Sequence, residues 1–186
     1  LSQADLEEGF VNIRYDVFKT VYASFWVELI HFWLEEDKNQ AELYTLLKFS
    51  LNALNTDELP KEVLSLLFQI RFMTLSGFFP NIVNCDNCKT PVDEIDQKDI
   101  RFDFREGRII CQNCEKKNSK YGMTISKGTL KQLFWINNSD ISRADRIKFS
   151  DFAIKEGQML LEAFLPFHIG RDFKSLDFLN RLRREK

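Results

Sequence analysis

The sequence predicts a mainly α-helical protein: a helical bundle domain interrupted by a small β-hairpin module that carries four cysteines. Three observations predict this fold. Apolar residues recur at helical spacing over most of the 186 residues. Only 7 Gly and 4 Pro occur, which is too few for a protein built of strands and turns. All four cysteines fall within residues 85–114, where the pattern changes to strand-like alternation.

Before the cysteines, three stretches repeat apolar residues every three or four positions and are expected to pack as helices. Pro60 suits the first position of the third helix, and Gly77 suits its end. The three predicted helices cover residues 10–35, 40–55 and 60–73.

After the cysteines the chain is expected to return to helices. Ser126 and Ser150 are typical N-caps, and Gly170 is a typical helix end. The final "FKSLDFLNRLRREK" predicts a short helix with a basic tail. We therefore predict a helical domain whose first part is residues 1–84, a ribbon at 85–118, and a second helical part at 119–186 that packs on the first.

Charge is distributed unevenly along the chain. Residues 1–84 carry 6 basic and 12 acidic side chains, residues 85–120 carry 8 of each, and residues 121–186 carry 12 basic and 8 acidic. The last third is therefore the place where an acidic partner would bind, if there is one. Taken alone, the uneven charge is better explained by charges that merely solvate the surface of the protein. The chain begins with Leu, so we expect a fragment of a longer protein. Neither a membrane span nor a signal peptide is recognisable.

The cysteines form two Cys-x-x-Cys pairs, separated by 22 residues. Between them, "IRFDFREGRII" alternates and turns at Glu106-Gly107, which predicts a β-hairpin that brings the pairs together. Four thiolates satisfy a tetrahedral Zn²⁺. We therefore predict a structural zinc ribbon, with the ligands Cys85, Cys88, Cys111 and Cys114.

Other uses of the cysteines fit less well. Disulfides require an oxidising compartment, which nothing in the sequence indicates. A thioredoxin-type site requires a strand-to-helix Cys-x-x-Cys, and a catalytic zinc normally has His or carboxylate ligands. The ribbon could also read nucleic acid, with Phe102 and Phe104 available for stacking. Eight acidic residues offset its eight cations, and this balance favours a folding clip.

No catalytic motif is present. The sequence has no Gly-rich phosphate loop, no nucleophile elbow and no His-Glu-x-x-His. His31 lies among apolar residues and is expected to be packed against other helices. We therefore expect a binding protein, not an enzyme.

The order of these parts resembles the C-terminal part of the RecO family of bacterial recombination mediators. The most specific pieces are "RFMTLSGFFPNIVNCDNC" and "FHIGRDFKS", on either side of the ribbon, and the resemblance covers essentially the whole chain. It implies that an oligonucleotide-binding β-barrel precedes this chain. It also implies a non-catalytic protein of the cytoplasm, associated with the nucleoid, that acts in DNA repair and homologous recombination. It also implies partners: RecR, single- and double-stranded DNA (mainly through the barrel), and the acidic, apolar C-terminal tail of the single-stranded DNA-binding protein SSB. Through these it implies strand annealing and RecA loading.

The resemblance further suggests where partners bind. A pocket for the terminal aromatic of the SSB tail, with cations for its carboxylates, would be formed by Phe164, Phe167, His168, Arg171, Phe173 and Lys174. DNA phosphates would be contacted by Arg181, Arg183, Arg184 and Lys186. Each of these residues also has a purely structural alternative, as a core aromatic, a helix-end cation or part of a frayed tail. Two other functions stay open: a zinc-ribbon transcription or replication accessory protein, and a purely structural scaffold.

Overall fold

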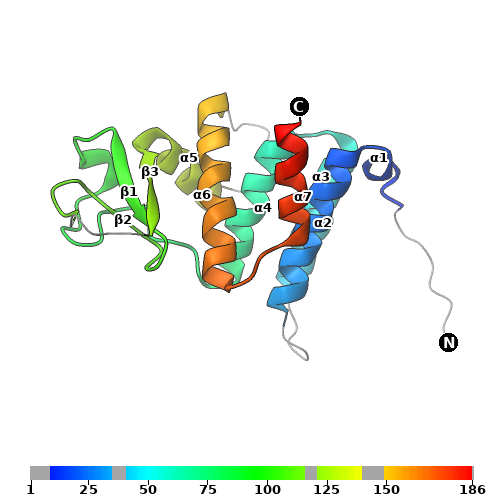
Figure 1. Cartoon of the computed structure of the whole chain (residues 1–186), viewed down its shortest axis with the longest axis horizontal. Helices are drawn as coiled ribbons and strands as arrows, with labels where there is room; N and C mark the ends of the chain where they lie inside the picture. Colours follow the sequence, from blue (N-terminus) through cyan, green and yellow to red (C-terminus); the bar gives the residue numbers. More distant parts are fainter. Residues whose placement is uncertain (1–8, 35–40, 116–120, 140–148, 186) are drawn as a thin grey trace. The chain divides into compact units, whose positions relative to one another are not determined.

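The computed structural model describes residues 9–34, 41–115, 121–139 and 149–185, which fold into two compact units. The described part of unit 1 is residues 9–34, 41–61 and 173–185, and that of unit 2 is residues 62–115, 121–139 and 149–172. Both units are built mainly of helices, and unit 2 also contains a three-stranded sheet (Figure 1). The predicted fold class is confirmed. No described helix has the length and apolar character needed to cross a membrane.

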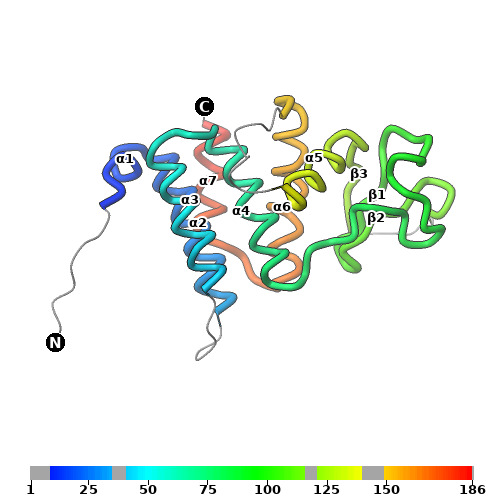
Figure 2. Tube along the Cα trace, turned by 180° about the vertical axis from the view of Figure 1, so that it is seen from behind, coloured from blue at the N-terminus to red at the C-terminus, as the bar shows by residue number. Residues whose placement is uncertain are grey.

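Unit 1 joins the two ends of the chain. It consists of α1 (Val11–Arg14), α2 (Val17–Trp33), α3 (Ala41–Thr56) and α7 (Lys174–Arg184). Helix α7 lies along α2 (Figure 1), and α3 also contacts α2, as seen from behind in Figure 2. The core centres on α2, whose Phe25 and Trp26 are fully buried. Phe173, immediately before α7, packs edge-on against Phe25 with ring centroids 5.9 Å apart.

The single helix predicted over residues 10–35 is in fact two helices. Asp16 adopts an extended conformation between α1 and α2, and its side chain accepts a hydrogen bond from the Lys19 amide at 3.0 Å. This is an N-cap, which satisfies an otherwise orphaned amide of α2 and ends α1. The prediction failed here because the helical spacing of apolar residues continues across the two residues that separate α1 from α2.

Helix α7 depends on a residue of α2 for its own cap. Its N-cap position is Phe173, which has no side chain that can accept a hydrogen bond. The Glu28 carboxylate takes over this role: it accepts hydrogen bonds from the amides of Lys174 (3.1 Å) and Ser175 (3.0 Å) and from the Ser175 hydroxyl. Burial acts to raise the pKa of Glu28, but these hydrogen bonds outweigh it and hold the pKa below its ordinary value of 4.5.

Unit 2 places helices beside a small sheet. It contains α4 (Lys61–Leu75, apart from its first residue), a 3₁₀ turn (Val92–Glu94), α5 (Lys127–Asn138) and α6 (Asp151–Ile169). The strands β1 (Asp99–Asp103), β2 (Arg108–Ile110) and β3 (Gly122–Ser126) form an antiparallel sheet in the order β2-β1-β3. Gly157 of α6 allows close packing, because a Cβ there would lie 3.3 Å from the side chains of Leu66 and Leu133.

The predicted hairpin is confirmed as β1 and β2, with Phe102 paired to Ile109, but β3 was not predicted. This strand follows the ribbon directly and pairs with β1, where the sequence had indicated a return to helices. Gly122 makes the pairing possible, since a Cβ at this position would lie 2.0 Å from the carbonyl oxygen of Phe102. Any other residue would push β3 away from β1.

The predicted helix boundaries are confirmed where their signals are local. Gly77 and Gly170 adopt left-handed conformations with φ of 78° and 72° at the ends of α4 and α6. Ser126 caps α5 by accepting from the Thr129 amide, and Ser150 caps α6 by accepting from the Ala153 amide, both at 3.2 Å. His31, which was expected to be packed, is exposed on α2. That prediction was wrong because neighbouring residues of a helix point about 100° apart, and it is Ile30 that is buried.

We expect Glu28→Gln to lower the free energy of unfolding by about 1 kcal/mol at neutral pH, the usual worth of an N-cap. The lowered pKa makes this stabilisation present above pH 4.5 and lost as the pH falls through the folded-state value. Urea unfolding of both proteins at about pH 7 and about pH 3.5 checks the sign, since the difference between them should shrink at the lower pH. Glu185→Gln, an exposed carboxylate at the other end of α7, is the control; an equal loss there would refute the capping role.

Candidate functional site

Two backbone turns aim the cysteine side chains at one point in unit 2. In the first turn the Lys89 amide donates to the Cys85 carbonyl at 2.8 Å, and Lys89 adopts a left-handed conformation with φ of 61°. In the second turn the Cys114 amide donates to the Cys111 carbonyl at 2.9 Å. The turns are joined directly, because the Cys111 amide donates to the sulfur of Cys85 at 3.3 Å.

The four sulfur atoms have the spacing of a metal site. All lie within 4.8 Å of one another, and those of Cys88 and Cys111 are 3.7 Å apart. A tetrahedral zinc with bonds of about 2.3 Å would separate its sulfur ligands by about 3.8 Å. Cys85 and Cys111 are buried, whereas Cys88 is exposed. The cluster can therefore hold a metal ion, and it is the one group of His, Cys, Asp or Glu residues with such spacing in the described part of the chain.

The ionisation of the thiols shows why this cluster suits a cation. Hydrogen bonds from Thr90 lower the pKa of Cys88 to about 6, whereas the hydrogen bond with Cys111 raises the pKa of Cys114 to about 12. The two thiols differ because Thr90 stabilises the Cys88 thiolate by hydrogen bonds, whereas the neighbouring cysteines disfavour the Cys114 thiolate. A bound dication would stabilise all four thiolates together.

An ion-pair network fixes the first turn to the sheet. Asp86 accepts a hydrogen bond from Lys89 at 2.9 Å and pairs with Arg108 of β2. The hydrogen bonds from Lys89 and Arg108 hold the pKa of Asp86 below its usual value. The Asp86 amide also donates to the carbonyl of Ile109 at 3.0 Å. The cysteine turn and the hairpin therefore form one body.

The six residues predicted for partner binding do not form one pocket within a single unit. Phe164 and Phe173 are each only 1% exposed, so both are core residues. Phe173 and Lys174 belong to unit 1, whereas the other four belong to unit 2. Of those four, Phe167, His168 and Arg171 are exposed at the C-terminal end of α6. Their surroundings in unit 2 are where an accessible site can be sought.

Five rings gather at this end of α6, and we call Phe78, Phe104, Tyr121, Phe167 and His168 the aromatic surface. His168 stacks on Phe78 with centroids 4.7 Å apart. Phe167 lies 6.1 Å from Phe104 and 6.0 Å from Tyr121. Phe78, which is half-buried, and Tyr121, which is exposed, were not among the predicted site residues, because only the fold brings them close to α6.

The aromatic surface rests on the core of unit 2. Buried Phe164 lies 5.3 Å from His168 and 6.5 Å from Phe104, and it contacts Phe102 of the sheet edge-on at 5.4 Å. Phe102 is fully buried and therefore not available for stacking on a base, contrary to what the sequence suggested. On the outside, the Arg105 guanidinium lies 5.0 Å from the centre of the Tyr121 ring.

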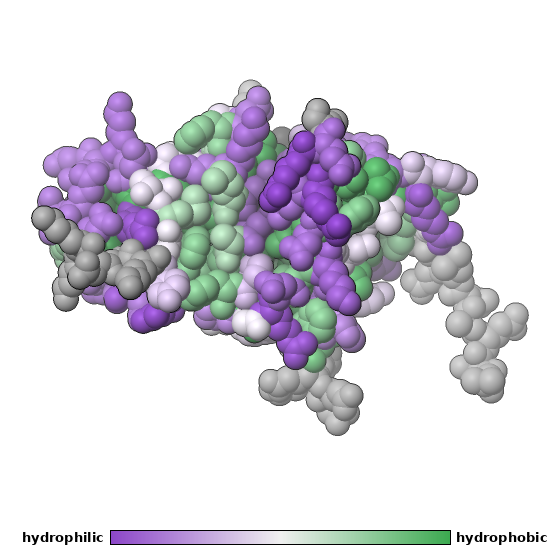
Figure 3. Space-filling view, viewed as in Figure 1, coloured by the Kyte–Doolittle hydropathy of each residue, from purple (hydrophilic) through white to green (hydrophobic). Residues whose placement is uncertain are grey.

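Hydrophobic surface continues along α6 away from this cluster. Phe152 is 63% exposed and Met159 64%, and Figure 3 shows a column of hydrophobic surface over the helix. Phe167 is 43% exposed near the end of the same helix, and the exposed cation Arg171 follows two residues after the helix ends. An exposed apolar surface of this kind, bordered by a cation, is typical of a binding site.

The residues predicted to contact DNA behave differently from one another. Arg181 and Arg184 are exposed on α7, and the Arg181 guanidinium lies 5.7 Å from the Phe178 ring. Arg183 instead donates to the Tyr22 hydroxyl at 2.8 Å and lies over the Tyr22 ring, so it serves the packing of α7 on α2. Lys186 lies outside the described residues.

Comparison with known proteins agrees with this architecture. The family model described as "Recombination protein O C terminal" matches residues 14–177. A DNA repair protein RecO of Desulfatibacillum aliphaticivorans is 40% identical over 184 residues, covering 99% of this chain and 71% of the relative. One from Desulfosudis oleivorans is 37% identical over 186 residues, covering 98% and 72%. One from Syntrophus aciditrophicus is 28% identical over 185 residues, covering 99% and 70%.

These matches and the fold define a DNA repair protein of mainly helical structure that carries a four-cysteine ribbon. The chain belongs to the RecO family and corresponds to the C-terminal part of its members. The resemblance seen in the sequence is thereby confirmed.

Proposed function

We propose that this chain is a non-catalytic mediator in recombinational DNA repair, which holds a structural zinc ion and binds the C-terminal tail of SSB through the aromatic surface. The observation that carries the proposal is the group formed by exposed Phe167 and His168 with half-buried Phe78 at the C-terminal end of α6, which the exposed Arg171 follows in sequence. RecR and single- and double-stranded DNA are further proposed partners. Membership of a DNA repair family supports this class of function.

The metal would be zinc, bound by Cys85, Cys88, Cys111 and Cys114. Four thiolates suit this ion, and four ligands leave no open position for a substrate. A ribbon of about 30 residues buries too little to be stable alone, so metal binding would contribute directly to its folding. The role proposed for zinc is therefore structural.

The SSB tail is acidic and ends in an aromatic residue, and the chemistry of the aromatic surface matches both features. Exposed rings offer edge-on and stacked contacts of the kind already seen between Phe78 and His168. Arg171 offers a guanidinium for a carboxylate, and Arg105 adds a second cation beside Tyr121. This site keeps Phe167, His168 and Arg171 from the sequence-based set and replaces the buried Phe164 and Phe173 by Phe78 and Tyr121.

A weaker contact with DNA phosphates is proposed for α7. Arg181 and Arg184 are exposed on this helix, and phosphate contacts need exposed cations on a fixed backbone. Such contacts position a strand without reading its sequence, as annealing of arbitrary complementary strands requires.

Metal analysis tests the zinc proposal. We expect about one zinc per purified chain, and a loss of at least half of it in Cys111→Ser, because a buried ligand is removed. Glu115→Gln is the control: it changes an exposed carboxylate next to the ligand Cys114 and should retain the metal. Full zinc content in Cys111→Ser would show that the thiols are not the ligands.

Fluorescence anisotropy with a labelled SSB tail peptide tests the aromatic surface. We expect saturable binding that weakens with salt and falls about tenfold in Phe167→Ala and in Arg171→Glu, since a hot-spot side chain is worth about 1.4 kcal/mol or more. Phe178→Ala and Lys155→Glu make the same changes at exposed positions outside the aromatic surface and should leave the affinity unchanged. Absence of binding by the folded, zinc-loaded chain would refute the proposed tail site.

The same assay with a labelled oligonucleotide tests α7. Arg181→Glu with Arg184→Glu should weaken DNA binding uniformly across sequences and reduce its salt dependence by about one to two released counterions. Binding that keeps its salt dependence in this double variant would exclude these arginines as phosphate contacts.

A further inference from the structure

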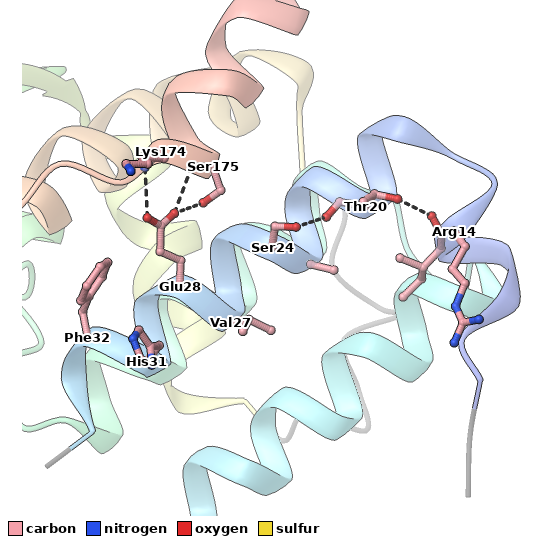
Figure 4. A pocket seen from close by; sticks show the side chains of 11 residues that line it. Arg14, Thr20, Ser24, Val27, Glu28, His31, Phe32, Lys174 and Ser175 are labelled. Atoms are coloured by element: carbon pink, nitrogen blue, oxygen red, sulfur yellow. Dashed lines mark hydrogen bonds between the residues drawn. The ribbon is translucent and has the colours of Figure 1, made fainter. Parts of the chain in front are cut away.

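A second candidate surface lies in unit 1, and neither the metal centre nor the aromatic surface contributes to it. It is a groove of about 820 Å³ formed by α1, by one face of α2 and by the start of α7 (Figure 4). The lining side chains of α2 recur every three or four residues, as Thr20, Ser24, Val27 and His31. One face of a helix, about 16 Å long between Thr20 and His31, therefore forms the floor.

Three polar side chains of the groove, those of Thr20, Ser24 and Glu28, already have hydrogen-bond partners within the protein. The Thr20 hydroxyl donates to the Ile13 carbonyl at 2.7 Å, and the Ser24 hydroxyl donates to the Thr20 carbonyl at 2.8 Å. Glu28, the one carboxylate of the lining, accepts three hydrogen bonds from the first turn of α7. Figure 4 shows these contacts as dashed lines. An apolar partner can therefore cover these three side chains without breaking any of their hydrogen bonds.

The remaining lining is apolar and accessible. Val27 is 47% exposed and Phe32 is 39% exposed, although both lie in the middle or at the end of a well-packed helix. Ala23 is small, so a partner backbone can approach α2 closely between these larger side chains. Removing the exposed apolar area from water would favour binding of a matching apolar surface.

Charge at the two ends of the groove selects the partner. Figure 4 shows Arg14 at one end and Lys174 at the other, on either side of the apolar centre. Within the described residues no carboxylate is paired with the Arg14 guanidinium, and Glu28 offsets one of the two cations. The lining is therefore net positive. If two copies of this chain met through the groove, the cations of one copy would face the cations of the other. This repulsion disfavours self-association through the groove.

We propose that this groove binds an amphipathic α-helix of a partner protein, about three turns long, with an apolar face flanked by acidic residues. Helical grooves recognise such segments through apolar side chains at i, i+3 or i+4, and i+7. Val27 and Phe32 contact the apolar face, and Arg14 and Lys174 pair with the acidic ends. Because the groove belongs to unit 1, the proposal stands independently of the zinc and of the SSB tail site.

A designed peptide tests this directly on the whole chain. The probe is a labelled, stapled helix of about 16 residues with leucines along one face and glutamates at both ends, and staples remove the cost of helix formation. Its companion has the same leucines with lysines at the ends. We expect the acidic peptide to bind saturably and at least about tenfold more tightly than the basic one, with an affinity that falls as salt rises.

Variants of the chain locate the binding. Val27→Glu should weaken the acidic peptide by at least about tenfold, because it places a like charge in the apolar centre. Val83→Glu is the matched control, since Val83 is 43% exposed but belongs to unit 2, and it should have no effect. Arg14→Glu with Lys174→Glu should reverse the preference between the two peptides.

Three results would overturn the proposal: no binding by the folded chain, equal binding of both peptides, or binding that Val27→Glu does not change. Preferential binding to anionic phosphatidylglycerol vesicles, abolished by Val27→Glu without any peptide binding, would assign the groove to a membrane surface instead. Loss of SSB tail binding in Phe167→Ala with unchanged peptide binding would confirm that the two sites are separate.

Discussion

The ribbon and the sheet that it forms with β3 are too small to bury a hydrophobic core of their own. The stability of unit 2 depends on the contacts that make up for this missing core. The four sulfurs converge within 4.8 Å and join two turns that lie 22 residues apart in sequence. Phe102 of the ribbon packs edge-on against Phe164 and so attaches the ribbon to α6. On one side lie four cysteines that can hold a metal ion, and on the other lies a shared aromatic core; a bound metal would add to the apolar burial that a module of this size lacks.

That arrangement explains why the aromatic surface lies where it does. Its rings come from the ends of α4, β1 and α6 and from the residue before β3, four segments that meet only when the ribbon is docked. Phe164, buried beneath them, contacts both His168 and Phe104. The two sequence pieces that flank the ribbon are neighbours in space, because the His168 ring stacks on the Phe78 ring.

Features of the fold that depend on a few neighbouring residues could be predicted from the sequence. Features that depend on contacts between residues far apart in the sequence could not. The doubled Cys-x-x-Cys, the Glu106-Gly107 turn and the serine caps act over a few residues, and each was identified from sequence. Strand β3 pairs with β1 across more than twenty residues and depends on Gly122 approaching Phe102, which no periodicity reveals. Likewise Phe164 and Phe167 are three residues apart and equally aromatic, yet only packing decides that one is buried and the other exposed. Sequence could therefore place candidate residues on α6 but could not decide which of them are accessible.

Exposed aromatic and apolar side chains cost a protein solubility without adding stability, so their distribution carries information about binding. In unit 1 the Thr20 and Ser24 hydroxyls and the Glu28 carboxylate already have partners within the protein, so an apolar partner can cover them at little cost but gains no specific hydrogen bond from them. Specificity there must come from shape and from the cations at its ends. In unit 2 the aromatic surface depends on the ribbon for Phe104 and Tyr121, so a loss of metal would disturb this surface first. The two proposed surfaces belong to separate compact units, and only one of them draws residues from the cysteine module, so each can be altered without changing the residues of the other.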